Sequence, residues 1–520
     1  MREIMRSASA SNTSDASARM QAKVPSKPSL SRRSSGLLLH PTSLLGLRGG
    51  TLGAEALRFV DFLADCGQSW WQMLPVCPPD ELGSPYASPS SFAGSPGLIC
   101  ADLLAVEGLL KKSELGQSKE KALRAAFGQF RKRASREKKE DFEAFRVREA
   151  WWLADHALFF ALKDANHGRP WTEWDERLRR REPARLDEAR ANVPDELRYH
   201  EFAQWLFARQ WQAVRRHAAA RGVSLMGDAP IYVRHDSADC WAHQDLFFLD
   251  NEGRPTAVAG VPPDYFSATG QLWGNPLYRW DRHQETGFAW WTARLKACAE
   301  RFDALRLDHF IGFRNYWEIP AGETTAVKGR WVEAPGEELF KAVRREVEGL
   351  EIVAEDLGVA TPEVLALRDQ FKFPGMRLAQ FSFGGSEKDW PENWPENCVG
   401  YTGTHDNDTA RGWWEDAGAS NAQRPAETAE KERRAFSRAL GREPELPSWD
   451  LLSLVWRSPA RTVIVPMQDV LNLGGDGRMN RPGSAENNWR WRMEAGALTA
   501  SLAARLALLT GACSRAPHPQ

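Results

Sequence analysis

Short runs of apolar and β-branched residues recur along the chain, and each is followed by polar or glycine-rich residues and then by a stretch with helical spacing. This order is typical of repeated strand–helix units. The eight predicted strands are 35–41, 70–76, 224–233, 304–310, 351–357, 376–383, 398–405 and 462–471. Enough chain separates them for crossover helices, which favours a closed parallel barrel over an open doubly wound sheet. The sequence therefore predicts an α/β protein built on a (β/α)8 TIM barrel.

The predicted strands are unevenly spaced. About 150 residues separate the second from the third and about 70 separate the third from the fourth, far more than an ordinary strand–helix loop needs. We therefore expect large, mainly helical insertions at about 78–222 and about 234–300. The charged runs between 111 and 150 could bind a polyanion, but their interleaved acids and bases are typical of a solvated helix face.

The two ends are predicted to lie outside a single barrel domain at 35–512. Residues 1–34 are rich in Ser, Ala and Arg, poor in acids and without the apolar centre of a secretory signal, which is typical of a disordered extension. A plastid transit peptide shares this composition, so the expected location is cytoplasmic, with the plastid as the alternative. Residues 513–520 are expected to form a short tail.

Bulk composition narrows the class of partner. Lys and Arg total 68 against 69 for Asp and Glu, so no net field attracts nucleic acid or an anionic membrane. The 23 tryptophans can fill cores, and their flat faces can also stack on sugar rings. The seven cysteines form no C-x-x-C pair, which indicates neither zinc nor a disulfide framework. No apolar run reaches the ~18 residues that span a bilayer, and 498–512 is predicted to be a final packed helix.

Carboxylates gather where the predicted strands end, which is the face that carries the active site of a (β/α)8 barrel. The fourth strand ends in RLDHF, so Arg306 and Asp308 share one side by the two-residue period of a strand. A guanidinium beside a carboxylate stabilises its charged form, which suits a nucleophile rather than a proton donor. Asp308 is therefore the predicted nucleophile.

Two further strand ends supply acids to the same rim. The fifth strand ends in AEDLG, where Glu355 and Asp356 face opposite sides and only one can point into the barrel mouth. We choose Glu355, because a partly desolvated glutamate near other carboxylates has the raised pKa that a general acid requires. The seventh strand ends in GTHDND, which brings His405 and Asp406 to the rim.

Three acids at one rim fit glycoside cleavage, in which one carboxyl protonates the leaving oxygen and another attacks or activates water. A single acid at a strand end is more often a helix cap or an ion-pair partner. A metal-dependent barrel enzyme stays open as an alternative, since six rim side chains are competent ligands. These are Asp308, His309, Glu355, His405, Asp406 and Asp408.

At these residues the chain resembles the amylomaltases, also called 4-α-glucanotransferases or disproportionating enzymes, of glycoside hydrolase family 77 in the α-amylase superfamily. The shared motifs are SGLLLHPTSLLG, GSPYASPSSFAGSP, GDAPIYV, GVPPDYFSATGQLWGNPLY, RLDHF, AEDLG, PGMR, GTHDND and RMNRPGSAENNWRWR. The stretch PPDYFSATGQLWGNPLY is highly specific, whereas RLDHF or AEDLG alone would indicate only the superfamily. The resemblance covers nearly everything except the N-terminal tail and the last few residues.

The resemblance implies that Asp308 forms a β-glucosyl-enzyme, that Glu355 is the acid and base, and that Asp406 stabilises the transition state. It implies retaining transfer of an α-1,4-glucan segment from a maltooligosaccharide or amylose to the 4-hydroxyl of glucose or another glucan. The other substrate contacts that it implies are Arg306, His405, Ser84, Tyr86, Asp228, Asp264, Gln271, Trp273, Asn275 and Asn480. We expect no cofactor or metal, and neither nucleic acid nor a membrane as a partner.

The resemblance also makes 264–273 part of a flexible loop over the acceptor side. Two prolines stiffen the entrance of this loop, and Gly270 and Gly274 allow tight bends. Tyr265 and Phe266 either stack on sugar or only pin the loop to the barrel. A loop that holds sugar better than water favours transfer over hydrolysis.

Two other functions remain as alternatives. One is an α-amylase-type hydrolase with the same carboxylates, and the other is a non-catalytic glucan-binding protein, against which the intact carboxylates argue. Three positions depart from the family pattern: Ala87 replaces a glutamine, Arg481 replaces a threonine, and Arg234 stands where a small residue is common. None is a catalytic carboxylate, so they leave open only the donor length preference and the ratio of hydrolysis to transfer.

Overall fold

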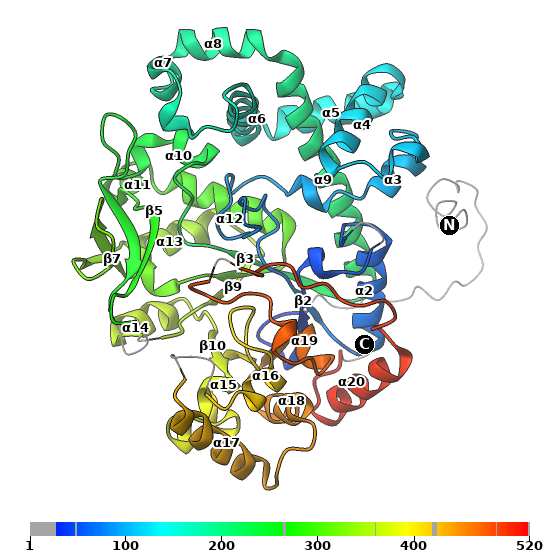
Figure 1. Ribbon diagram of the computed structural model, residues 1–520, viewed down its shortest axis with the longest axis vertical. Helices are drawn as coiled ribbons and strands as arrows, with labels where there is room; N and C mark the ends of the chain where they lie inside the picture. Colours follow the sequence, from blue (N-terminus) through cyan, green and yellow to red (C-terminus); the bar gives the residue numbers. More distant parts are fainter. Residues whose placement is uncertain are drawn as a thin grey trace.

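Eight short parallel strands close into a barrel, in the order β1-β12-β11-β10-β9-β6-β3-β2 (Figure 1). The computed structural model describes residues 28–46, 49–263, 267–358, 360–418, 424–484 and 486–517. The strands are β1 (Ser34–Leu38), β2 (Trp70–Gln72), β3 (Ser224–Ala229), β6 (Ala304–Leu307), β9 (Glu351–Ala354), β10 (Gly375–Leu378), β11 (Cys398–Tyr401) and β12 (Thr462–Pro466). All eight fall within the predicted runs or one residue before them, so the predicted barrel is confirmed. Each run was predicted too long at its end, because the apolar pattern continues into the loops of the barrel mouth.

The barrel strands are buried on both faces, as a parallel barrel surrounded by helices requires. One apolar cluster fills the interior: Leu38, Trp70, Leu74, Met226, Ala304, Val353, Met376, Leu378, Val399, Tyr401 and Ile464 are among its members. The alternate side chains point outwards to the helices. The inward-facing side chains of each strand therefore form a row that starts in the apolar interior and leads to the barrel mouth.

The insertion between β2 and β3 consists of helices that pack on one side of the barrel (Figure 1). They are α3 (Ala101–Val106), α4 (Lys119–Arg133), α5 (Arg136–Arg148), α6 (Ala150–Ala165), α7 (Glu176–Arg179), α8 (Pro183–Asn192) and α9 (Pro194–Ala220). Phe202, Trp205 and Trp211 on α9 are almost fully buried. Through these side chains α9 joins the helical group to the barrel.

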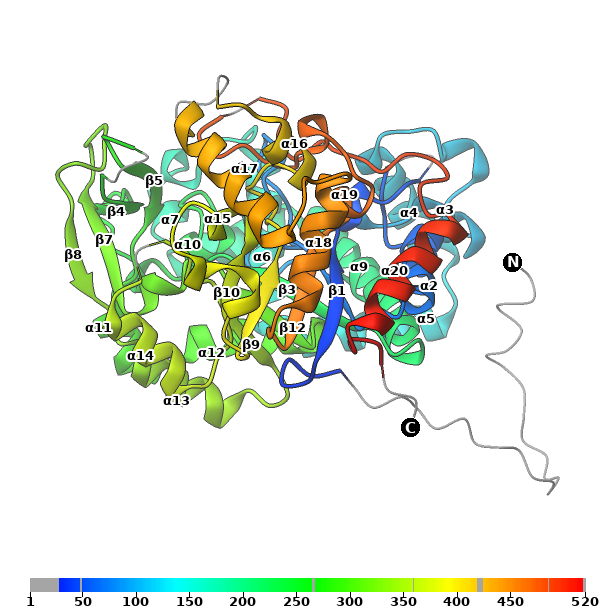
Figure 2. The same ribbon diagram turned by 90° about the horizontal axis from the view of Figure 1, so that it is seen from below.

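The insertion between β3 and β6 holds both helices and strands. Its helices are α10 (Ala238–Ala242), α11 (Trp280–Glu285) and α12 (Ala289–Arg301). Its strands β4 (Ala257–Val261) and β5 (Gln271–Pro276) join β7 (Asn315–Pro320) and β8 (Arg330–Glu333) in an antiparallel sheet of order β5-β4-β7-β8. Figure 2 shows this sheet beside the barrel. The repeated strand–helix pattern does not predict this sheet, because its strands lie on both sides of β6 along the chain.

The remaining helices surround the barrel. They are α2 (Ala54–Asp65), α13 (Gly336–Glu346), α14 (Pro362–Gln370), α15 (Ala379–Ser382), α16 (Ala410–Glu415), α17 (Ala426–Leu440), α18 (Pro447–Arg457), α19 (Met467–Val470) and α20 (Ala500–Ala512). Helix α20 is the predicted final helix, with Leu506 buried. Among the described residues no helix has both the length and the apolar character to cross a bilayer.

Both ends of the described chain contact the barrel. Ser29 Oγ donates a 2.6 Å hydrogen bond to Glu351, and Leu30 is buried. The guanidinium of Arg515, fully buried, donates to the backbone oxygens of Ser34, Trp456 and Ser458. Most of the predicted extension, 1–27, lies outside the described residues, and the predicted domain boundaries stay predictions.

Candidate active site

The inward rows of β6 and β9 turn polar at the barrel mouth. On β6, Ala304 lies in the interior cluster, so the two-residue period turns Arg306 and Asp308 to the same side. On β9, Val353 lies in the cluster, and Glu355 follows it two residues later. Carboxylates and a guanidinium therefore lie above the apolar interior. The two-residue alternation of a strand is enough to explain their positions.

Arg306 joins two carboxylates through one nitrogen. Its Nη1 lies 2.8 Å from Asp308 Oδ1 and 2.9 and 2.8 Å from Asp228 Oδ1 and Oδ2. The side chains of Arg306 and Asp228 are 5% and 1% exposed, whereas that of Asp308 is 29% exposed. Burial opposes the charge on Arg306, but the two carboxylates raise its pKa well above the usual value. Asp308 therefore faces the mouth as an anion held by a permanent cation.

Asp228 lies beneath this pair. It is predicted to contact substrate, but its buried carboxylate is held by Arg306 and by Tyr86, whose Oη donates to Oδ2 at 2.8 Å. Burial raises the pKa of Asp228, and the charge on Arg306 opposes this. The geometry makes Asp228 a support for Arg306 and Tyr86.

Glu355 points into the mouth beside this pair. Its Oε2 accepts a 2.7 Å hydrogen bond from the backbone N–H of His309, and its Oε1 accepts one at 3.1 Å from Leu357. Burial, reinforced by the charge on Asp308 and opposed by Arg306, raises the pKa of Glu355 to about 8. Its neighbour Asp356 faces away and pairs with Arg368. The raised pKa therefore favours the protonated form of Glu355 beside the ion pair of Arg306 and Asp308.

The loop after β11 brings the third acid. Asp406 Oδ1 accepts a 2.6 Å hydrogen bond from Asn480 Nδ2 and lies 3.3 Å from His405 Nε2. The guanidinium of Arg478 donates to the backbone oxygen of Asp406 at 2.7 Å. The Asp406 side chain is 42% exposed. Asn480, His405 and Arg478 therefore fix an accessible carboxylate.

Tyr86 forms an aromatic wall with His405. Their rings stack at 5.0 Å with 9° between the planes, and Trp489 lies 5.8 Å from Tyr86 and 5.9 Å from His405. Ser84 Oγ accepts from the Tyr86 backbone N–H at 3.3 Å, so Ser84 shapes the turn that presents the ring. Trp489 is not among the predicted site residues. It lies in the family motif RMNRPGSAENNWRWR, and this motif is the one sequence signal that could have indicated a place for Trp489 in the site.

The strand β5 closes the other side of the mouth. Trp273, 37% exposed, meets the His309 ring edge-on at 4.8 Å, and its Nε1 donates to Gln271 Oε1 at 3.1 Å. Asn275 Nδ2 donates to the backbone oxygen of Val233 at 3.0 Å and so ties β5 to the loop after β3. Asp264, Tyr265 and Phe266 lie outside the described residues. Trp273 is thus the aromatic of this insertion that reaches the residue next to Asp308.

Comparisons with known proteins show the family to which the chain belongs. The model of glycoside hydrolase family 77, described as 4-alpha-glucanotransferase, matches residues 39–499. The chain belongs to this family. A 4-alpha-glucanotransferase of Thermus thermophilus is 48% identical over 501 residues, 93% of this chain and 99% of the relative. A chloroplastic/amyloplastic 4-alpha-glucanotransferase of Arabidopsis thaliana is 41% identical over 481 residues, 89% of this chain and 82% of the relative.

Solved structures place the chain in the same family. An amylomaltase of Streptococcus agalactiae in complex with acarbose has a TM-score of 0.87 at 37% identity, over 93% of this chain and 100% of that one. An amylomaltase of Corynebacterium glutamicum shares the fold, with a TM-score of 0.74 at 20% identity over 94% of this chain and 75% of that one. The predicted membership of the 4-α-glucanotransferase family is confirmed.

Two of the three departures from the 4-α-glucanotransferase pattern lie at the edge of the mouth. Arg234 Nη1 pairs with Glu81 Oε2 at 2.9 Å. Arg481 is exposed, and its backbone N–H donates to Asn488 Oδ1 at 2.8 Å. Ala87 follows the stacked Tyr86 in the chain and is half-buried. Arg234 is therefore neutralised by an ion pair at this edge, whereas Arg481 is exposed.

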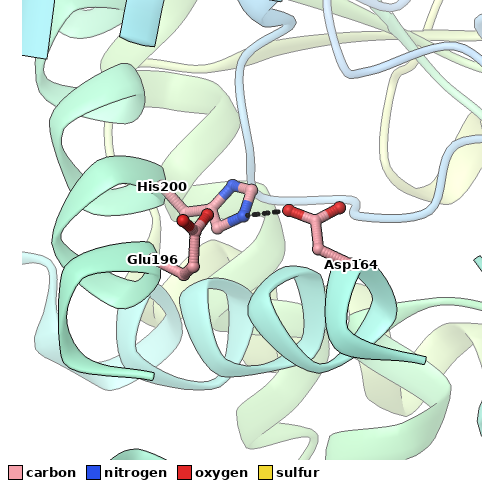
Figure 3. Close-up of side chains that lie close together, drawn as sticks. All are labelled: Asp164, Glu196 and His200. Carbon is pink, nitrogen blue, oxygen red and sulfur yellow. Dashed lines mark hydrogen bonds and ion pairs between the residues drawn. The ribbon is translucent and has the colours of Figure 1, made fainter. Parts of the chain in front are cut away.

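A group of possible metal ligands lies in the helical insertion of this protein. In the part of the chain that the structure describes, one group of three lies together: Asp164 on α6 with Glu196 and His200 on α9 (Figure 3). His200 Nε2 lies 3.2 Å from Asp164 Oδ2, and Arg124 pairs with Glu196 at 2.9 Å and with Asp164 at 3.5 Å. A guanidinium already neutralises these acids, so the group is an ion-pair network that joins α4, α6 and α9.

Proposed function

We propose that this 4-α-glucanotransferase transfers α-1,4-glucan segments by a retaining double displacement, with Asp308 as nucleophile and Glu355 as acid and base. One observation carries the proposal: at one rim, an anionic Asp308 paired with Arg306 lies beside a Glu355 whose pKa is raised to about 8. Two carboxyl groups in opposite protonation states are what the first step of a retaining mechanism needs.

In the first step Asp308 attacks the anomeric carbon of the donor glucan. Arg306 occupies Oδ1, so Oδ2 is the attacking oxygen. As the bond from Asp308 to carbon forms, the glycosidic bond breaks and its electron pair goes to the leaving 4-oxygen. Glu355 gives its proton to that oxygen. The products are a β-glucosyl ester on Asp308, a shortened glucan with a free 4-hydroxyl, and an ionised Glu355.

In the second step an acceptor 4-hydroxyl replaces the leaving group. Glu355, now a carboxylate stabilised by the N–H groups of His309 and Leu357, takes the proton of that hydroxyl. The acceptor oxygen bonds to the anomeric carbon, and the ester bond to Asp308 breaks. Both carboxyl groups return to their starting states, and the glucan has moved to its new 4-position with retained configuration.

The remaining rim residues hold the sugar during both steps. Asp406, fixed by Asn480 and His405, accepts hydrogen bonds from ring hydroxyls, and the Tyr86 ring offers a stacking face. On the acceptor side Trp273 offers a second face next to His309. A glucose or glucan seated there lies closer to the ester than bulk water does, which favours transfer over hydrolysis.

The proposed compartment is the cytoplasm, with the plastid as the alternative. All seven cysteines are free thiols. Burial raises the pKa of Cys66 to about 12 and that of Cys77 to about 11, so neither is a reactive thiolate. Unpaired, inert thiols suit a reducing compartment.

Maltotriose tests the proposal, because it serves as both donor and acceptor. Transfer gives glucose and a ladder of longer maltooligosaccharides, which chromatography resolves. Glucose and maltose without longer products would instead establish the α-amylase-type hydrolase. Loss of the ladder in a strong chelator, with recovery on adding a divalent metal, would establish the metal-dependent alternative.

A further inference from the structure

One buried side chain holds both ends of the loop that carries His405 and Asp406. This loop runs from Thr402, the residue after β11, to Ala410, the first residue of α16. Asp469 Oδ2 accepts a 2.5 Å hydrogen bond from the Thr402 hydroxyl, and Oδ1 accepts one at 2.7 Å from the backbone N–H of Ala410. A single carboxylate therefore joins the point where the chain leaves the barrel to the point where the next helix begins.

Gln380 contacts the same loop from the opposite side. Its backbone N–H donates to the Thr402 backbone oxygen at 3.2 Å, and its Nε2 donates to the backbone oxygen of Asp408 at 2.8 Å. A Cβ atom at Gly403 would lie 2.8 Å from that Nε2, so the loop packs directly on the amide. Asp469 lies on α19 after β12 and Gln380 on α15 after β10, and these two strands flank β11 in the barrel. The loop is thus held from both neighbouring strands, and Figures 1 and 2 show α16 between α15 and α19.

The side chains that hold the loop cannot contact substrate themselves. Thr402 and Asp469 are fully buried, and Gln380 is 4% exposed. The tip of the loop does reach the mouth, where the half-exposed Asp406 accepts the hydrogen bond of Asn480. Any effect of Asp469 on the reaction must therefore pass through the residues of the loop.

The carboxylate of Asp469 is buried without a cation. Burial, aided by the charge on Asp408 and opposed by the hydrogen bonds from Thr402 and Ala410, raises the pKa of Asp469 to about 6. In the part of the chain that the structure describes, no Lys or Arg forms an ion pair with it. A buried charge without an ion-pair partner destabilises a fold, but hydrogen bonds to a charged acceptor are shorter and stronger than neutral ones. The charge therefore tightens the two hydrogen bonds that fix the loop.

We propose that Asp469 is a positioning residue for glucan transfer, because its carboxylate fixes the ends of the loop 402–410 and so places Asp406 against the sugar ring. Gln380 assists from the other side. This role rests on the proposed function, which assigns Asp406 to the ring hydroxyls. A displacement of about 1 Å at a reacting centre can lower a rate by about 10²-fold, so a loosened loop acts on kcat.

A contact that only stabilised α16 would have a different signature. Thr409 already caps this helix, since its Oγ1 accepts from the Gly412 N–H at 2.9 Å. Loss of a further capping contact lowers the Tm and leaves the kcat of the folded enzyme unchanged.

T402V tests the positioning role, because valine has the shape of threonine but no hydroxyl to donate to Asp469. We expect kcat for maltotriose to fall by about tenfold and KM to change by less than about twofold, since Asp406 leaves its place in the transition state. T402S keeps the hydroxyl and should recover most of the kcat. D469N should lose less than D469A, because an amide can still accept from the Ala410 N–H and donate to Thr402 Oγ1.

A double-mutant cycle determines whether the effect passes through Asp406. In D406N the group that the loop positions is already disabled, so T402V should lower the residual kcat by less than about twofold. A loss of folded protein would lower kcat by the same factor in both backgrounds. A crystal structure of T402V should show Asp406 Oδ1 displaced from Asn480 Nδ2, which lies 2.6 Å away in the wild type.

Thr510 supplies the matched control, because it is also fully buried and hydrogen-bonded but lies on α20. Its hydroxyl accepts from Gln68 Nε2 at 2.9 Å, just before β2 and so at the entry end of the barrel. T510V should lower the Tm and leave kcat and KM unchanged.

Three results would overturn the positioning role: unchanged kcat in T402V, an equal loss of kcat in T510V, or an undiminished effect of T402V in the D406N background. Absence of maltotriose transfer by the wild-type protein would overturn the proposed function instead. The position of Asp406 in the T402V crystal structure would then decide whether Asp469 positions it.

Discussion

The Nη1 atom of Arg306 lies 2.8 Å from Oδ1 of Asp308 and within 2.9 Å of both carboxylate oxygens of Asp228. One guanidinium therefore holds the proposed nucleophile in position. The buried Asp228 below it keeps Arg306 from turning towards the mouth. The same Asp228 receives the Tyr86 hydroxyl, so a single ion pair orders both the nucleophile and the aromatic wall.

Replacing Asp308 by Asn should abolish transfer while leaving glucan binding intact. The amide keeps the shape of the side chain but cannot form the ester, so we expect kcat to fall by at least about 10³-fold. Transfer is measured on maltotriose, and binding of maltoheptaose is measured by calorimetry. D187N, which changes an exposed acid on α8, is the control and should keep full maltotriose transfer. Unchanged turnover in D308N would mean that another group is the nucleophile.

Activity should fall as pH rises through about 8. Glu355 must carry the proton that it donates, and its pKa is raised to about 8 by burial. The alkaline limb of kcat/KM for maltotriose therefore reports this group. E355Q should lose transfer at every pH and show no alkaline limb in its residual rate. An alkaline limb that persists in E355Q would assign that limb to another residue.

The same carboxyl group should make stability depend on pH. Its folded pKa lies above its unfolded value, so the folded state binds the extra proton between roughly pH 4.5 and 8. The stability that Glu355 contributes is complete below this window and is lost as pH rises through it. E355Q cannot ionise, so its Tm relative to wild type should increase between pH 5 and pH 8.5. A constant difference in Tm across that range would contradict a raised pKa.

Exchanging Asn480 for Asp should damage the site without removing volume. Asn480 Nδ2 lies 2.6 Å from Asp406 Oδ1, so the variant sets two carboxylates against each other and moves the Asp406 side chain. We expect kcat/KM for maltotriose to fall on the order of tenfold or more at pH 7. Partial recovery at lower pH, where the pair can share a proton, distinguishes this repulsion from a folding defect. The control N393D alters an asparagine on the surface that lies outside the mouth and should have no effect on transfer.

Trimming Trp273 should shift the outcome from transfer to hydrolysis. The exposed indole next to His309 is the proposed acceptor platform, and W273A lets water compete for the glucosyl ester. The ratio of reducing ends released to glucosyl units transferred should rise by about severalfold, with little change in donor cleavage. W331A removes an indole from the same sheet and should leave the ratio as in wild type. Loss of donor cleavage together with transfer would show that Trp273 acts in the first step.

Much of the catalytic rim follows from the two-residue period of a strand. Ala304 and Val353 are apolar positions of the barrel interior, and counting by two from them gives Arg306, Asp308 and Glu355. These positions follow from local spacing and depend on no long-range contact, so they could be predicted from the sequence. The choice of Glu355 over Asp356 rests on the same alternation.

Other parts depend on contacts that sequence patterns do not encode. Trp489 reaches Tyr86 and His405 from a segment more than 80 residues after β11, and no spacing rule links it to either ring. The burial of Asp228 follows from its pairing with Arg306 across neighbouring strands. The sheet of β4, β5, β7 and β8 is formed by strands on both sides of β6, which a linear search for repeated units divides between two insertions.

The buried guanidinium of Arg515 has a practical consequence. It bonds to the backbone oxygen of Ser34 at 3.1 Å, so the last described turn of the chain meets the first residue of β1. Ser34 is at the entry end of its strand, whereas Asp308, Glu355 and Asp406 follow the exit ends of theirs. A solid support or fusion partner attached near either of these positions would thus sit on the far side of the barrel from the catalytic rim. Such an anchored enzyme should still admit polymeric glucans.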